Sequence, residues 1–164
     1  MDLQAISEEH KREIQSKVSM DYIKSSDFMI FYSNALEELI KIKNVEKLKY
    51  FRSAIINGMI RQDIEENKKL LFIDALSNLP VDTLILLKQI ADMGIRRRDT
   101  RYSFEAILNE SKNDEHLLAA QLKALERYNL VVIIRATGME TYRHDLIIYG
   151  RFGKEFINFT TSYQ

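Results

Sequence analysis

Arginine side chains form the densest cluster of residues in this sequence that could bind a ligand. Four arginines fall within the six positions from Arg96 to Arg101. A guanidinium group binds phosphate oxygens through two parallel hydrogen bonds, so such a cluster is typical of a surface that contacts a nucleic-acid backbone. Further basic residues follow later in the chain. The predicted nucleic-acid-binding residues are Arg96, Arg97, Arg98, Arg101, Lys123, Arg127 and Arg143.

The arginine cluster also has explanations that need no ligand. Positive charge beyond the end of a helix complements the partial negative charge of its last carbonyl groups, and we expect a helix to end at Gly94. Runs of charge are usually solvated, and the arginines could equally pair with carboxylates of the N-terminal helices. These interpretations stay open beside the nucleic-acid hypothesis.

The motifs of common enzymes and metal sites are not found in this sequence. A zinc-protease motif needs two histidines one helical turn apart, but His10, His116 and His144 are scattered. The absence of cysteine excludes thiol nucleophiles and cysteine-ligated metals. The segment from Gly150 to Lys154 has too few residues between its glycines for a phosphate loop. We therefore expect a non-enzymatic protein with no catalytic residue, metal or cofactor.

An acidic cluster at Asp63, Glu65 and Glu66 could suggest a metal site. Carboxylates are also favoured in the first turn of a helix, where they complement the positive end of the helix dipole. We interpret this cluster as the start of a helix.

The first half of the chain is predicted to consist of about four amphipathic helices, because apolar residues recur every three or four positions. The first helix is expected to run through Tyr22, and Ser25, Ser26 and Asp27 to break it and cap the next. The apolar faces of the other three helices are predicted to be Tyr32, Leu36, Leu39 and Ile40; Val45, Leu48, Phe51, Ile55 and Met59; and Phe72, Ile73, Leu76 and Leu79.

The second half is predicted to contain three helices and a β-hairpin. Pro80 suits the first turn of a helix, Ser103 can cap a second, and Asn113 or Asp114 can cap a third. Leu130 to Ala136 and Tyr142 to Tyr149 are strand-like segments on either side of a turn at residues 137–140. The predicted fold is mainly α with a small β-hairpin, with a helical region over residues 1–79 and a second domain over residues 80–164.

This order of three helices and a β-hairpin resembles a winged helix-turn-helix domain. Residues 122–131 resemble the stretch in which such a domain ends its third helix and enters the wing. Asn129 occupies the place of the usual glycine, and asparagine tolerates a positive φ better than most residues. The resemblance implies a winged-helix-like domain, for which a DNA-binding or regulatory role is an analogy from architecture.

Three further segments, residues 46–58, 72–79 and 149–156, look like parts of uncharacterised bacterial proteins of the abortive-infection-alpha type. This resemblance implies a helical platform joined to a winged-helix end. It also implies a link to phage defence, without a known chemistry.

The third helix of the predicted domain has some residues that favour DNA binding and others that oppose it. Its outward row is expected to be His116, Ala120, Lys123 and Arg127, and Gln121 is a candidate base reader. Asp114 and Glu115 stand at the end that normally enters the major groove, where they would repel phosphate.

Charge and hydropathy narrow the class of protein. The 24 basic and 24 acidic residues cancel, which excludes a strongly electrostatic DNA binder. No apolar run approaches the roughly 20 residues that span a bilayer, so we expect a cytoplasmic protein without a membrane partner. We expect a self-associating homodimer whose partner is DNA. The alternative is a protein-interaction module of a phage-defence or mobile-element system that does not bind DNA.

Overall fold

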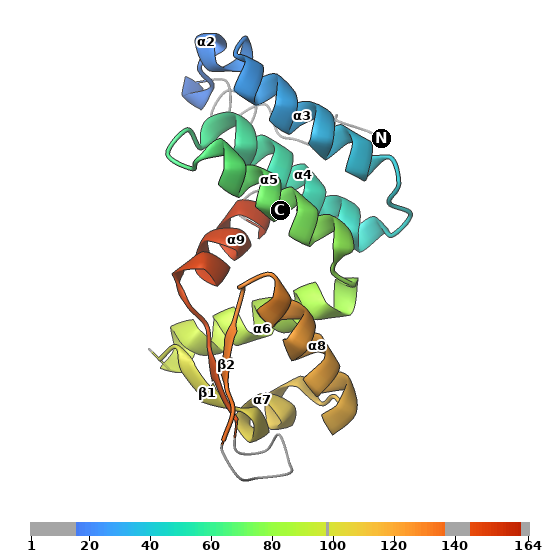
Figure 1. The fold of residues 1–164 in the computed structure, drawn as a ribbon, viewed down its shortest axis with the longest axis vertical. Coiled ribbons are helices and arrows are strands. Elements are labelled where there is room, and N and C mark those ends of the chain that lie inside the picture. Colours follow the sequence, from blue (N-terminus) through green and yellow to red (C-terminus); the bar gives the residue numbers. More distant parts are fainter. Residues whose placement is uncertain (1–15, 98, 137–144, 162–164) are drawn as a thin grey trace. The chain divides into compact units, whose positions relative to one another are not determined.

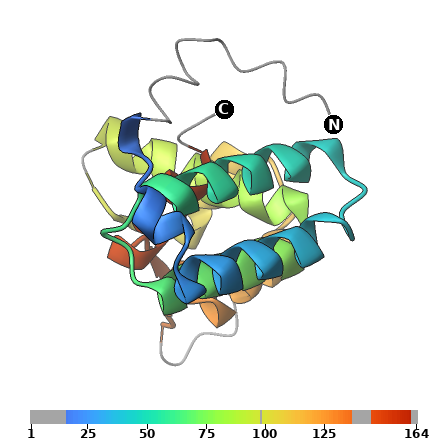
Figure 2. The ribbon, with the colours of Figure 1, turned by 90° about the horizontal axis from the view of Figure 1, so that it is seen from above.

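The computed structural model describes residues 16–97, 99–136 and 145–161, and its helices and strands are drawn in Figures 1 and 2. The chain divides into two compact units. The helical unit comprises residues 1–77 and 159–164, and the mixed unit comprises residues 78–158. The fold is mainly α with a small antiparallel sheet, as predicted. None of the helices in the described part of the chain is long and apolar enough to cross a membrane.

Four complete helices follow one another in the described part of the helical unit. These are α2 (Met20–Ile23), α3 (Ser26–Leu39), α4 (Val45–Ile60) and α5 (Glu66–Asn78), whose last residue lies beyond the unit boundary. The last residues of α9 (Arg151–Thr161) also belong to this unit. Figure 1 shows α3, α4 and α5 side by side.

Polar side chains set the beginnings of several helices. Ser25 caps α3 and Asn44 caps α4, each by accepting a hydrogen bond from a backbone N–H three residues later. The predicted break at Ser25 is therefore confirmed. The prediction of one helix running through Tyr22 is wrong, because the chain is extended at Ser19, whose side chain caps the separate short helix α2.

Aromatic rings fill the core of the helical unit. Phe31, Phe51, Phe72 and Phe159 are fully buried, and the ring centroid of Phe159 lies 5.3 Å from that of Phe72 and 6.4 Å from that of Phe31. The predicted apolar face of α5 is also confirmed. Phe72, Ile73 and Leu76 of α5 are buried, and so is the predicted Leu79, which follows the last residue of the helix.

The buried faces of α3 and α4 differ from the predicted ones. In α3 the buried residues are Phe28, Phe31 and Ala35, whereas the predicted Ile40 is 81% exposed. Apolar residues occupy much of the circumference of α3, so periodicity alone does not decide which part of the helix faces the core. In α4 the predicted Val45 is 71% exposed. The predicted Phe51 is buried, and the other buried residues of α4, which were not predicted, are Tyr50, Ser53, Ala54, Asn57 and Gly58.

The mixed unit alternates helices and short strands. Its elements are α6 (Val81–Arg97), β1 (Arg101–Ser103), α7 (Phe104–Ser111), α8 (Glu115–Arg127), β2 (Val132–Ile134), β3 (Leu146–Ile148) and most of α9. The caps Ser103 and Asp114 are confirmed. The expected end of α6 at Gly94 is wrong, since the helix continues to Arg97. Gly94 instead lies close to the hydroxyl group of Tyr102, where a Cβ atom would come within 3.0 Å of that oxygen.

The sheet has three antiparallel strands in the order β1-β3-β2. The strand β1 was not predicted, and β2 is shorter than the predicted strand over residues 130–136. The strand β3 lies within the second predicted strand, whereas the predicted turn at residues 137–140 and residues 142–144 lie outside the described residues. Tyr102 and Ile147 face each other in the register and are buried. Val132 and Ile134 lie on the opposite face of β2 and are about half exposed, at 52% and 50%.

Among the described residues other than glycine, two take the left-handed conformation that favours glycine. Asn129 has φ 57°, as its place after α8 predicts, and its N–H donates to the carbonyl of Glu126. Lys112 has φ 58° at the C-cap of α7. The positive φ of Lys112 was not predicted.

Candidate nucleic-acid interface and a buried lysine cluster

The exposed face of α8 carries the predicted outward row. His116, Ala120, Lys123 and Arg127 are all exposed. On the other side of the helix Leu118, Leu122 and Leu125 are buried, as predicted. The amphipathic pattern of α8 therefore orients Lys123 and Arg127 correctly, because both cations lie one helical turn apart on the solvent side.

The structure adds Arg135, which the sequence analysis did not select. Arg135 follows β2 and borders a small depression together with Lys123 of α8, Ile133 and Asp145. The depression has a volume of about 10 Å³, which suits roughly one water molecule and not an organic ligand. Arg135 joins this surface because β2 packs beside α8, and that proximity is not visible in the spacing of residues along the chain.

Carboxylates take part in this surface and hold its elements together. Glu126 Oε2 lies 2.7 Å from Nη2 of Arg135, and its Oε1 accepts a hydrogen bond from the backbone N–H of Ile133 at 3.3 Å. Asp145 Oδ1 accepts from the N–H of Ala136 at 3.1 Å. These carboxylates connect α8 and β3 to the strand between them, and their negative charge weakens the attraction of the surface for phosphate.

The N-terminal end of α8 holds the two acidic residues that were expected to repel phosphate, Asp114 and Glu115. Asp114 is the N-cap, and its Oδ1 accepts a hydrogen bond from the N–H of Leu117 at 2.9 Å. Gln121 is 5% exposed, and its side-chain oxygen accepts from Nδ2 of Asn113 at 2.8 Å. Gln121 is therefore engaged inside the unit, and its proposed role as a base reader is wrong.

Arg96 and Arg97 do not lie beyond the end of a helix, as the expected helix end at Gly94 implied. Arg96 and Arg97 belong to the last turn of α6, and Arg101 is an exposed residue of β1. The guanidinium of Arg96 forms an ion pair with Glu110 of α7, and this hydrogen bond raises the pKa of Arg96. Two other predicted residues, Arg98 and Arg143, lie outside the described residues.

The sheet order separates the remaining arginines. Arg101 is on β1 and Arg135 follows β2, with β3 between these two strands. Of the described cations, Lys123 and Arg135 therefore border one surface, and Arg127 continues the exposed row from Lys123. Arg96 and Arg101 lie elsewhere in the unit.

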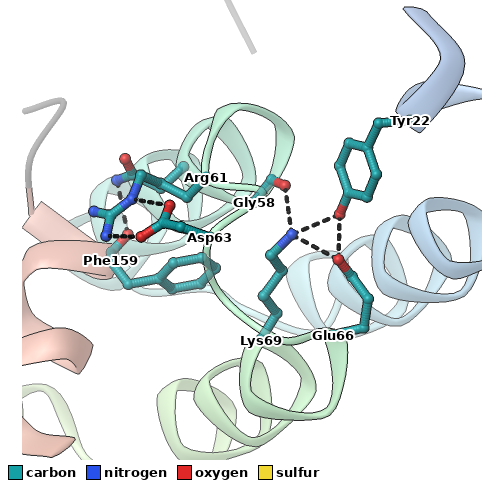
Figure 3. Close-up of polar contacts among 8 residues, drawn as sticks. Tyr22, Gly58, Arg61, Asp63, Glu66, Lys69 and Phe159 are labelled. Carbon is teal, nitrogen blue, oxygen red and sulfur yellow. Dashed lines mark hydrogen bonds and ion pairs between the residues drawn. The ribbon is translucent and has the colours of Figure 1, made fainter. Parts of the chain in front are cut away.

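The helical unit contains a buried lysine that the sequence analysis did not single out. Lys69 of α5 is 0% exposed, and Figure 3 shows its ammonium group among three oxygen atoms. Its Nζ donates to the hydroxyl oxygen of Tyr22 at 2.6 Å, to Glu66 Oε1 at 2.7 Å and to the carbonyl of Gly58 at 3.2 Å. The Tyr22 hydroxyl in turn donates to Glu66 Oε1 at 2.7 Å.

This geometry gives the lysine a structural role. An ammonium group has three N–H donors, and each of them has an acceptor here. The Nζ atom also lies 4.6 Å from the centre of the Tyr22 ring, within the range of a cation–π interaction. Burial, and then the hydrogen bond to Glu66, raise the pKa of Tyr22 above its usual value. A nucleophilic lysine needs a free lone pair on Nζ, whereas here Nζ donates three hydrogen bonds. The arrangement therefore suits a lysine that links α2, α4 and α5 more than one that reacts covalently.

The acidic cluster resolves into separate ion pairs. Both side-chain oxygens of Asp63 contact the guanidinium of Arg61, at 2.7 and 2.8 Å (Figure 3). These bonds lower the pKa of Asp63. Glu66 lies in the first turn of α5 and pairs with Lys69, so its placement at a helix start is confirmed. No group of three potential metal ligands occurs among the described residues.

Comparison with known proteins gives no relative. No protein-family model, curated protein or solved structure matches this chain. The two resemblances seen in the sequence therefore stay predictions. Any functional argument depends on the chain's own geometry.

Proposed function

We propose that the chain is a non-enzymatic winged-helix protein whose mixed unit binds the backbone of duplex DNA. The element order α6, β1, α7, α8, β2, β3 supports the winged-helix assignment, since it supplies three helices and an antiparallel hairpin. In this proposal α8 is the helix that approaches DNA. In this proposal the antiparallel pair of β2 and β3 is the wing.

The observation that carries the proposal is the surface shared by α8 and the end of β2. Lys123 and Arg127 are exposed on one row of α8, and the side chain of Arg135 is 56% exposed beside it. Guanidinium and ammonium groups at this spacing can contact successive phosphates without reading bases. We infer non-specific backbone contacts, because Gln121 is engaged inside the unit.

The expected binding is weak and sensitive to salt. About three phosphate contacts correspond to a slope of roughly −3 in a plot of log Kobs against log salt concentration. Carboxylates near these cations reduce the affinity further, because Asp114 and Glu126 belong to α8 and its N-cap and Asp145 borders the depression beside Arg135. The formal net charge of zero supplies no additional long-range attraction.

Fluorescence anisotropy with a labelled duplex of generic sequence tests the proposal. The wild-type protein is expected to bind at low salt and to lose affinity as the salt concentration rises. The double variant Lys123→Ala, Arg127→Ala should lose most of this binding. The variant Lys154→Ala is a matched control, because Lys154 is an exposed cation of the mixed unit on α9. Absence of wild-type binding at low salt, or equal losses in both variants, would contradict the proposal.

The outer face of the sheet favours a second candidate function. Val132 and Ile134 expose half of their surface, and their register partners on β3, Ile148 and Leu146, are half-buried. Four aliphatic side chains on one sheet face are unusual for a surface that contacts only phosphate. A protein-interaction module that does not bind DNA, as in a phage-defence or mobile-element system, is therefore the alternative.

The proposal includes self-association through the helical unit. Several large apolar residues of α3 and of the start of α4 are exposed, including Met29, Ile40 and Val45. Light scattering across a range of protein concentrations tests this part. A mass that stays at that of the monomer would contradict it.

A further inference from the structure

Helix α2 is connected to α5 by the hydrogen bonds of one side chain. The helix has four residues, none of them is buried, and Met20 is 62% exposed. The Tyr22 hydroxyl donates to Glu66 Oε1 and accepts from Lys69 Nζ, as Figure 3 shows. A helix this short is not stable without contacts to the rest of the protein.

Lys69 keeps partners when Tyr22 is taken away. Two of its three acceptors, the carbonyl of Gly58 and Glu66 Oε1, belong to α4 and α5 and do not depend on α2. A water molecule entering the space of the phenol could replace the third acceptor. Loss of α2 from this position therefore leaves the ammonium paired, and it does not require α4 and α5 to separate.

The junction between α2 and α3 is also built to tolerate separation. Ser25 caps α3 through its own side chain, which accepts from the N–H of Phe28 at 3.1 Å. This cap depends on α3 alone. The first turn of α3 therefore stays satisfied when the residues before Ser25 move away.

We propose that α2 opens and closes over Lys69 as a local unit while α3, α4 and α5 stay folded, and that the Tyr22 hydroxyl holds it closed. In the closed state the phenol covers the ion pair of Lys69 and Glu66. In the open state this pair meets solvent and α2 is released from α5. Opening of this kind costs less free energy than global unfolding, because it breaks few contacts.

The neighbouring aromatic rings provide a matched control. The Tyr22 ring contacts Phe28 edge-on with centroids 5.4 Å apart, and the Tyr32 ring stacks on the same Phe28 at 5.6 Å. The substitution Tyr22→Phe keeps the ring and removes only the hydroxyl. The substitution Tyr32→Phe removes a hydroxyl beside the same Phe28 without touching Lys69.

Hydrogen exchange of the full chain tests the proposal. The backbone N–H groups of Ile23, Lys24 and Ser25 donate within and just after α2, so their exchange reports its opening. Tyr22→Phe is expected to speed this exchange by about tenfold, equivalent to about 1.4 kcal/mol, while peptides from α4 and α5 keep their protection. Tyr32→Phe should leave it unchanged. Glu66→Gln, which keeps the shape of the side chain, should give an intermediate acceleration.

Two results would overturn the proposal. Equal exchange around α2 in the wild type and Tyr22→Phe would mean that the hydroxyl does not hold the helix closed. Equal acceleration in α2, α4 and α5 would mean that Tyr22 is an ordinary core residue whose loss destabilises the whole unit. If Tyr22→Phe does not fold, the Glu66→Gln comparison decides between these outcomes.

Discussion

Gly58 of α4 lies directly against the ring of Phe31 in α3. A Cβ atom added at position 58 would overlap the Cζ and Cε1 atoms of that ring. Phe31 is fully buried and lies 6.4 Å from the ring of Phe159, so it has little room to move. The close approach of α3 and α4 therefore depends on a missing side chain.

Gly58→Ala is expected to destabilise the protein by about 1–3 kcal/mol, the usual cost of overpacking a core. Urea denaturation followed by circular dichroism measures the change. Gly150→Ala is the control, because no atom lies within 4 Å of the position that its Cβ would take. Equal midpoints for the two variants would contradict the clash.

Lys112→Gly is expected to raise the melting temperature. Lys112 has φ 58°, a conformation that costs an ordinary residue roughly 1–2 kcal/mol and glycine very little. Asn129→Gly should give a smaller increase, since asparagine already tolerates φ 57°. Thermal denaturation of both variants checks the order, and a lower melting temperature for Lys112→Gly would show that its side chain contributes more than the strain costs.

Asp114 combines a stabilising cap with a charge that opposes DNA. Asp114→Ala removes the acceptor for the N–H of Leu117 and should cost about 0.5–2 kcal/mol. Asp114→Asn keeps a good cap without the negative charge, so stability should be retained while affinity for duplex DNA rises. Thermal denaturation and the anisotropy titration together test this, and unchanged affinity would argue against α8 as the contacting helix.

Alkaline pH is expected to destabilise the helical unit through Tyr22. Burial and the hydrogen bond to Glu66 raise the folded-state pKa of Tyr22 above the reference value of 10.0. A raised pKa means that the folded state holds the phenol proton more tightly, so this stabilisation is complete below pH 10 and is lost as the pH rises beyond it. Denaturation at a series of pH values should show a steeper alkaline loss for the wild type than for Tyr22→Phe. Parallel curves would rule out this linkage.

The predictions that depend on residues close in sequence were confirmed most often. Ser25, Ser103 and Asp114 cap helices as predicted, because a cap needs only a short polar side chain and the N–H groups of the next few residues. The inward residues of α8 and the positive φ of Asn129 were predicted for the same reason. Gly94 is the exception, since its small size serves contact with Tyr102 and not the end of a helix.

Helix faces were harder to predict where more than one face is apolar. Phe28 and Phe31 of α3 are buried in the core, whereas the predicted Leu36 and Ile40 are exposed. The choice depends on which neighbour packs against the helix, and Gly58 admits the ring of Phe31. No periodicity within α3 carries that information.

The amino-acid sequence alone set the balance of charge, through its composition, and most helix positions and caps, because these depend on residues close in sequence. The folded chain added relationships between distant residues, and these define both candidate sites. Tyr22 and Lys69 are 47 positions apart, yet they share a hydrogen bond at 2.6 Å. Arg135 meets Glu126 and the surface of Lys123 only because β2 packs beside α8. Burial explains the first pairing, since the ammonium group of Lys69 is removed from water and must find acceptors wherever the packing of the helices supplies them. The second pair is partly exposed and depends on the position of β2 beside α8.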